Sequence, residues 1–148
     1  MATKVIVTGG LGFIGSHTVV ELQQKGYQVV IADNLSNSTI GTADRIAKIT
    51  GERPVVEVVD LADRDACLSF FRTHADARAV IHFAAAKAVG ESVQRPLHYY
   101  RNNLDSLMYV VEGMWQTSCR KLVYSSSCTV YGQPERLPVT EQTPRLAA

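Results

Sequence analysis

The sequence lacks any apolar run of about 20 residues, the length that a membrane-spanning helix needs. Its start, MATKVIVTGG, lacks the apolar core of a signal peptide. Cysteine is scarce: Cys67, Cys119 and Cys128 are an odd number without metal-type spacing, which is typical of reduced thiols in a cytoplasm. An excess of charge is missing too, because the formal net charge is +1. We therefore expect a cytoplasmic protein that binds neither nucleic acid nor membrane.

What the sequence does contain is a regular alternation of short apolar runs and helical patterns. Runs rich in valine and isoleucine predict strands at 4–8, 28–32, 55–59, 79–83 and 121–125. Helices are expected after residue 12, over 42–49, from a cap at Asp63 to about residue 73, and from Pro96 onward. Near-continuous apolar strands that alternate with helices are typical of a parallel sheet. We expect an α/β fold, a Rossmann-type doubly wound sheet of order 3-2-1-4-5.

The helix expected after Pro96 has a long apolar stripe. Its members recur at helical spacing and are Leu97, Tyr100, Leu104, Met108, Val111 and Trp115.

A glycine-rich turn follows the first strand, in TGGLGFIGSH. Its glycines are Gly9, Gly10, Gly12 and Gly15. Such a turn needs residues without a Cβ where the chain bends, where the backbone approaches a pyrophosphate, and where helix and strand pack closely. Phosphates would then meet the N–H groups at the start of the helix. The spacing predicts a dinucleotide site, and the alternative is a tight turn without a ligand.

Acidic residues end the second and third strands. Asp33 comes 18 residues after Gly15, where an acid hydrogen-bonds the ribose hydroxyls of a dinucleotide. Because a carboxylate repels a 2′-phosphate, the sequence favours NAD over NADP; the alternative is a helix or turn cap. Asn34, Asn37 and Ser38 offer further polar contacts. Asp60 and Leu61 follow the third strand, where an acid can accept from the adenine amino group and a leucine can lie against the ring.

Four segments together resemble the extended short-chain dehydrogenase/reductases, and within them the UDP-glucose 4-epimerase family. They are TGGLGFIGSH, DNLSNS, HFAAAKAVGESVQRPLHYYRNN and YSSSCTVYG. Related sugar-nucleotide dehydratases carry a Thr-Asp-Glu element after the fifth strand, where this chain has Cys128-Thr129-Val130. The resemblance implies an isomerase of galactose metabolism that interconverts UDP-glucose and UDP-galactose by transient oxidation at sugar C4 with bound NAD. It also implies a homodimer for the full-length protein.

The resemblance further implies a role for individual residues. Phe13 and Ile14 would meet the pyrophosphate, Asp33 to Ser38 the adenosine ribose, and Asp60 and Leu61 the adenine. Phe83, Ala84, Lys87 and Asn102 would lie along the cofactor, with Lys87 near the nicotinamide ribose and the substrate. Ser127 would hydrogen-bond the reacting hydroxyl as a catalytic and substrate-binding residue. The alternatives are a solvated Lys87, a merely polar Asn102 on its helix, and a Ser127 that is an ordinary residue of a surface turn.

The general base that the family uses is missing from these 148 residues. The family places it in a Tyr-x-x-x-Lys helix, where the lysine charge lowers the tyrosine pKa. No tyrosine here is followed four residues later by lysine. We therefore expect residues 1–148 to be an NAD-binding domain without the Tyr-x-x-x-Lys helix, the C-terminal strands and the substrate lobe, and to lack turnover alone. The alternatives are a non-catalytic NAD-binding module and a related sugar-nucleotide dehydratase or decarboxylase.

Overall fold

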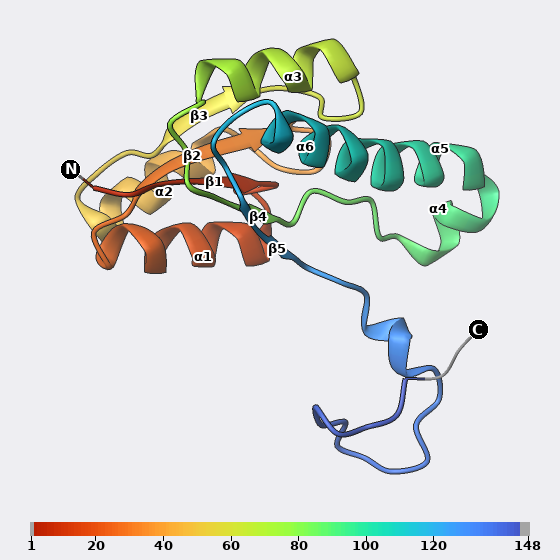
Figure 1. Cartoon of the computed structure of the whole chain (residues 1–148). Helices are drawn as coiled ribbons and strands as arrows, with labels where there is room; N and C mark the ends of the chain where they lie inside the picture. Colours follow the sequence, from red (N-terminus) through yellow and green to blue (C-terminus); the bar gives the residue numbers. More distant parts are fainter. Residues whose placement is uncertain (1, 146–148) are drawn as a thin grey trace.

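A parallel five-stranded sheet lies at the centre of the molecule (Figure 1). The structure is a computed structural model and describes residues 2–145. The strands are β1 (Lys4–Thr8), β2 (Gln28–Asp33), β3 (Val55–Val58), β4 (Ala79–His82) and β5 (Lys121–Tyr124). Their order is β3-β2-β1-β4-β5, and each neighbouring pair is parallel. The predicted fold class and strand order are thereby confirmed.

Helices connect the strands as the sequence predicts. They are α1 (Phe13–Gln24), α2 (Gly41–Thr50), α3 (Arg64–Thr73), α4 (Val89–Gln94), α5 (Pro96–Tyr100) and α6 (Ser106–Trp115). A π-helical turn, η1 (Arg101–Asp105), joins α5 to α6, and a 3₁₀ turn, η2 (Cys128–Tyr131), follows β5. Asp63 caps α3 as predicted, since its carboxylate accepts from the Ala66 N–H at 3.1 Å. The sequence did not predict α4, which buries no side chain and so has no apolar periodicity.

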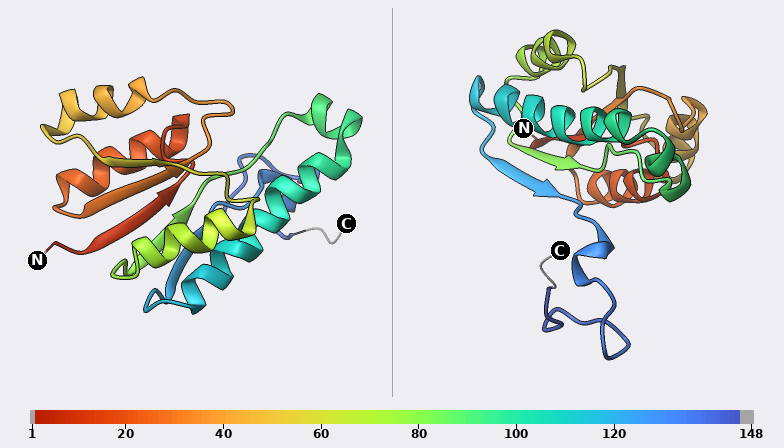
Figure 2. Two further views of the ribbon diagram at one scale, coloured as in Figure 1. Left: turned by 90° about the horizontal axis from the view of Figure 1, so that it is seen from above. Right: turned by 90° about the vertical axis from the view of Figure 1, so that its right-hand side faces the viewer.

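Two apolar layers cover the two faces of the sheet. Alternate strand residues point to opposite faces, so Ile6, Val30 and Val80 pack with α3 and α6 while Val7 and Ile31 pack on the other side. Figure 2 shows α1 and α2 on one face and α3 and α6 on the other. This arrangement leaves the carboxyl ends of β1, β2, β3 and β4 free to carry loops.

The helices α3 and α6 pack unusually closely at Gly113. A Cβ placed on Gly113 would lie 2.4 Å from Cδ2 of Phe71, and both residues are buried. Arg64 of α3 forms an ion pair with Glu112 of α6 on the outer side of this contact. The pair of helices therefore covers its face of the sheet as one layer.

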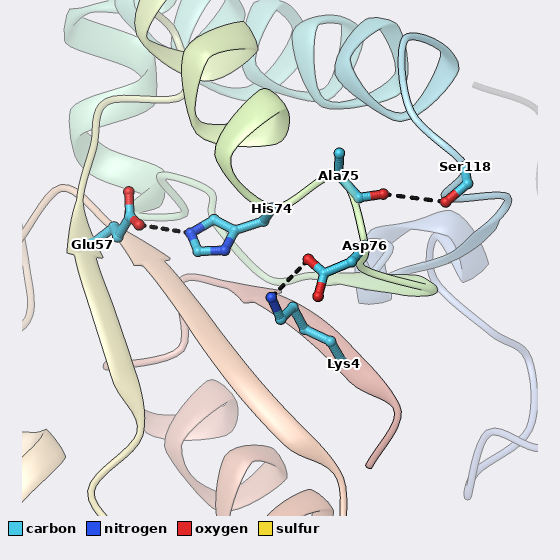
Figure 3. A network of polar contacts seen from close by, with 6 residues as sticks. All are labelled: Lys4, Glu57, His74, Ala75, Asp76 and Ser118. Carbon is cyan, nitrogen blue, oxygen red and sulfur yellow. Dashed lines mark hydrogen bonds and ion pairs between the residues drawn. The ribbon is translucent and has the colours of Figure 1, made fainter. Parts of the chain in front are cut away.

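The turn between α3 and β4 is tied to three other parts of the chain (Figure 3). Nε2 of His74 lies 2.6 Å from the Glu57 carboxylate, and Nζ of Lys4 lies 2.7 Å from that of Asp76. The Ser118 hydroxyl donates to the Ala75 carbonyl at 3.1 Å. These contacts fix the α3–β4 turn against β3, β1 and the turn before β5.

The apolar stripe predicted along the long helix lies on its outer face. Leu97, Tyr100, Leu104, Met108 and Trp115 are exposed, whereas Ser106, Val110, Gly113 and Met114 face the sheet. The edge strand β5 is exposed along its whole length, and the chain beyond it leads away from the sheet (Figure 1). Within residues 2–145, no helix combines the length and apolar character needed to cross a membrane.

Candidate functional site

The glycine turn joins the carboxyl ends of β1, β2 and β4. The Gly9 N–H donates to the Ala32 carbonyl at 2.8 Å, and Gly9 has a φ of +66°, which L side chains rarely adopt. A Cβ on Gly9 would lie 2.8 Å from the Ala84 nitrogen, and one on Gly15 would lie 2.2 Å from the Gly9 carbonyl oxygen. The turn therefore accepts only glycine at these two positions.

The start of α1 is open to a ligand. Gly12 is its N-cap residue and supplies no side-chain cap, and no acidic residue occupies the first turn. The side chains of Phe13 and Ile14 are 82% and 52% exposed. Because the first N–H groups of a helix have no intrahelical partners and carry partial positive charge, this end can accept a pyrophosphate. The described residues thus fit the anionic centre of a dinucleotide.

Asp33 organises the loops around this turn. One of its oxygens accepts from the Leu11 N–H at 3.1 Å, and the other accepts from the Leu35 N–H at 3.0 Å and the Ser38 hydroxyl at 2.7 Å. Asp33 therefore does cap a turn, which was the alternative that the sequence left open. A carboxylate has about four lone-pair sites, so three donors leave one for a ribose hydroxyl. Asn34 and Asn37 are exposed beside it.

The residues predicted at the end of β3 differ in exposure. Asp60 is exposed, and its carboxylate accepts from the Ala62 N–H at 2.9 Å. Leu61 is 4% exposed and belongs to the core beneath α3 and α6. The structure gives the Leu61 side chain a packing role, and the Asp60 carboxylate is the exposed polar side chain of the pair.

The loop after β4 lies against the glycine turn. The Phe83 N–H donates to the Thr8 carbonyl at 3.0 Å, and the Ala84 N–H donates to the Thr8 hydroxyl at 3.3 Å. Lys87 is exposed three residues later. Phe83 and Ala84 therefore lie beside the glycine turn.

An asparagine that the sequence analysis did not select holds this loop. The side chain of Asn103 accepts from the Ala86 N–H at 2.8 Å and donates to the Ala86 carbonyl at 2.9 Å. It also accepts from the amide of Asn102 at 2.9 Å. The adjacent asparagines of RNN were the signal, but helical spacing alone does not show which one reaches the loop.

His82 is a second residue that the sequence analysis did not select. Its side chain is 1% exposed, and Nδ1 lies 2.8 Å from the Thr8 hydroxyl. Nε2 is buried without a partner among the described residues, and the ring stacks on Tyr124 with centroids 5.9 Å apart. Burial lowers the pKa of His82 to about 4, so the imidazole is neutral near pH 7.

Ser127 hydrogen-bonds within its own turn. It is the N-cap of η2, where its hydroxyl oxygen accepts from the Thr129 N–H at 3.2 Å and lies 2.7 Å from the Thr129 hydroxyl. Its side chain is exposed. The hydrogen bonds of Ser127 within residues 2–145 are therefore local. In the same range no cluster of His, Cys, Asp or Glu is suited to hold a metal ion.

Curated proteins similar to this chain are UDP-glucose 4-epimerases. That of Bacillus subtilis is 50% identical over 140 residues, which are 95% of this chain and 41% of that protein. UDP-glucose 4-epimerase 2 of Arabidopsis thaliana is 49% identical over 148 residues, which are 97% of this chain and 42% of that protein. The chain thus spans about two fifths of the length of these relatives.

Solved structures give the same result. A UDP-glucose 4-epimerase from Stenotrophomonas maltophila with bound NAD and formylated UDP-arabinopyranose superimposes with a TM-score of 0.89 at 44% identity, over 99% of this chain and 43% of that one. One from Bifidobacterium longum with NAD+ and UDP gives 0.89 at 44%, over 97% and 42%. The model of the NAD dependent epimerase/dehydratase family matches residues 5–147. The chain therefore belongs to the NAD dependent epimerase/dehydratase family.

Proposed function

We propose that this chain is the NAD-holding part of a UDP-glucose 4-epimerase. The observation that carries the proposal is the junction of the glycine turn, Asp33 and the loop after β4, in a chain 50% identical to the Bacillus subtilis enzyme. The pyrophosphate would lie on the start of α1, and the adenosine ribose beside Asp33. Asp60 would reach the adenine, with Leu61 packing below it.

NAD rather than NADP is the cofactor that these residues favour. Asp33 is 7% exposed, and its carboxylate receives three hydrogen bonds. A 2′-phosphate would bring negative charge next to this carboxylate, in a site where little water screens the repulsion. When bound, NAD supplies a hydride acceptor, and after reduction a hydride donor, at C4 of the sugar.

Lys87 and Ser127 would act on the sugar side. The exposed Lys87 ammonium would donate to the nicotinamide ribose and to the substrate. The Ser127 hydroxyl accepts from the Thr129 N–H and would hydrogen-bond the 4-hydroxyl oxygen of the sugar. The sugar proton needs a base with a pKa near the working pH. Because these 148 residues hold no Tyr-x-x-x-Lys pair, we propose that they bind NAD without turning substrate over.

The same reasoning extends to assembly and location. The exposed stripe of Leu97, Tyr100, Leu104, Met108 and Trp115 is a surface on which a full-length homodimer could form. We propose such a homodimer, in the cytoplasm.

A hybrid enzyme tests the proposed function. In it this chain replaces the aligned N-terminal two fifths of the Bacillus subtilis relative. The hybrid should purify with NAD and convert UDP-galactose to UDP-glucose. A matched hybrid with Ser127→Ala should keep NAD and convert about a hundredfold more slowly, since it loses a hydrogen bond to the reacting hydroxyl. A hybrid that holds NAD but converts nothing contradicts the epimerase proposal, and a 4-keto-6-deoxy product supports a dehydratase instead.

A further inference from the structure

We propose that Asn103 is a positioning residue for the half of the site that holds the nicotinamide, an inference that rests on the proposed NAD function. Its side-chain amide forms two hydrogen bonds with the backbone of one residue in the loop after β4. It accepts from the Ala86 N–H at 2.8 Å and donates to the Ala86 carbonyl at 2.9 Å. Because one partner is a donor and the other an acceptor, the contact fixes which end of the amide is oxygen. Lys87 is the next residue, so these two hydrogen bonds fix where the backbone of Lys87 lies.

The π-helical turn η1 explains why an asparagine of the long helix reaches this loop. A π turn adds a residue to the helical repeat and changes the direction of the side chains on either side of it, and such turns are frequent at functional sites. Here Arg101–Asp105 form η1, and Asn102 and Asn103 lie inside it. The Asn102 side-chain nitrogen donates to the Asn103 side chain at 2.9 Å, and within residues 2–145 the Asn102 side-chain oxygen accepts no hydrogen bond. Asn103 therefore orients both Lys87 and Asn102.

Sheet topology assigns this loop to one half of the dinucleotide. In a doubly wound sheet the two mononucleotide halves lie on either side of the point where the strand order reverses. That point lies between β1 and β4 here, and Asp33 is the last residue of β2, on the adenosine side. The loop after β4 is on the other side, where it touches the glycine turn through Ala84. Loss of the hydrogen bonds between Asn103 and Ala86 should therefore weaken NAD binding and leave ADP binding unchanged.

The test is the affinity of the 148-residue chain for NAD and for ADP, by calorimetric titration. Asn103→Asp keeps the acceptor for the Ala86 N–H but sets a carboxylate against the Ala86 carbonyl, and Asn103→Ala removes both contacts. Each variant should bind NAD about tenfold more weakly, the change expected from one or two lost hydrogen bonds, with ADP affinity unchanged. The matched control is Ser118→Ala, which loses a side-chain bond to the Ala75 carbonyl near the amino-terminal ends of the strands. It should change neither affinity.

Equal losses for NAD and ADP would reduce Asn103 to a general stabilising residue and overturn the inference, as would unchanged affinities. Hydrogen exchange in the unmodified chain gives an answer that needs no variant. The Ala86 amide should exchange at least tenfold more slowly than the amides of Ala85 and Lys87, and equal rates would overturn the inference. If the unmodified chain binds neither NAD nor ADP, the proposed function fails. Slow exchange at Ala86 would then support only the hydrogen bonds between Asn103 and Ala86.

Discussion

The imidazole of His82 lies between the hydroxyl of Thr8 and the ring of Tyr124, almost without solvent contact. Burial holds its pKa at about 4, below the ordinary value of 6.5. Between these two values the unfolded chain binds a proton at His82 that the folded chain does not. Stability should therefore fall as pH falls through this window, and be unaffected by His82 above about pH 6.5.

This residue gives a prediction for stability against pH. Between pH 7 and pH 4.5, His82 should take roughly 2 kcal/mol from the free energy of unfolding, because its pKa is about 4 in the folded chain and about 6.5 in the unfolded chain. In His82→Gln that part of the pH dependence should disappear. Urea unfolding at both pH values measures it, with His98→Gln, an exposed histidine, as the control. An unchanged pH dependence in His82→Gln would mean that His82 is protonated in the folded chain.

Single residues of the site were predictable where chemistry and position coincide. Gly9 follows β1, Gly15 lies in the first turn of α1, and Asp33 ends β2, and the structure brings these residues around one turn. Asn103 was not predictable, because its reach depends on the π turn rather than on sequence spacing. For Leu61, the position at a strand end suggested a contact with adenine. Its side chain is buried in the core instead, and the sequence position alone does not reveal this burial.

At the scale of elements, the packing of α3 on α6 depends on the missing side chain of Gly113. The nearest atoms to a Cβ there are Cδ2, Cγ and Cβ of Phe71, which cannot all move aside. Gly113→Ala should therefore lower the free energy of unfolding by about 1–2 kcal/mol, because overpacking outweighs the gain in helix propensity. Thermal unfolding measures this change.

The matched control for that change is Gly90→Ala. Gly90 lies in α4, and nothing comes within 4 Å of a Cβ placed on it. This variant should leave Tm unchanged or raise it slightly. A Gly113→Ala protein as stable as the Gly90→Ala protein would show that the two helices separate easily, against the contact described here.

Elements with an apolar pattern were the predictable ones. The strands lie where the valine-rich runs place them, including β5, which is exposed along its whole length. The helices α1, α2 and α3 lie where the burial of one face imposes a helical period. Helix α4 has no buried residue and hence no period, so only the structure shows it. The stripe on α5 and α6 has a clear period, yet it faces outwards, since a period reveals a shared face but not what covers it.

At the scale of the whole molecule, the order of the strands determines where the site lies. Parallel strands put every carboxyl end on one edge, and the reversal of order between β1 and β4 opens a place for a dinucleotide there. The class of fold followed from the alternation of strands and helices. The exposure of β5 follows from its place at the edge of the sheet, where it has a strand on one side only.

Titration of the chain with NAD, and in parallel with NADP, tests the central claim most directly. The protein should have an intact mass that corresponds to these 148 residues, so that no other segment contributes. We predict saturable binding of NAD and at least tenfold weaker binding of NADP, because Asp33 repels the 2′-phosphate. In Asp33→Asn this preference should largely vanish, while Asp76→Asn, at the Lys4 ion pair, should keep it. Equal binding of both nucleotides by the unmodified chain, or binding of neither, would contradict the account.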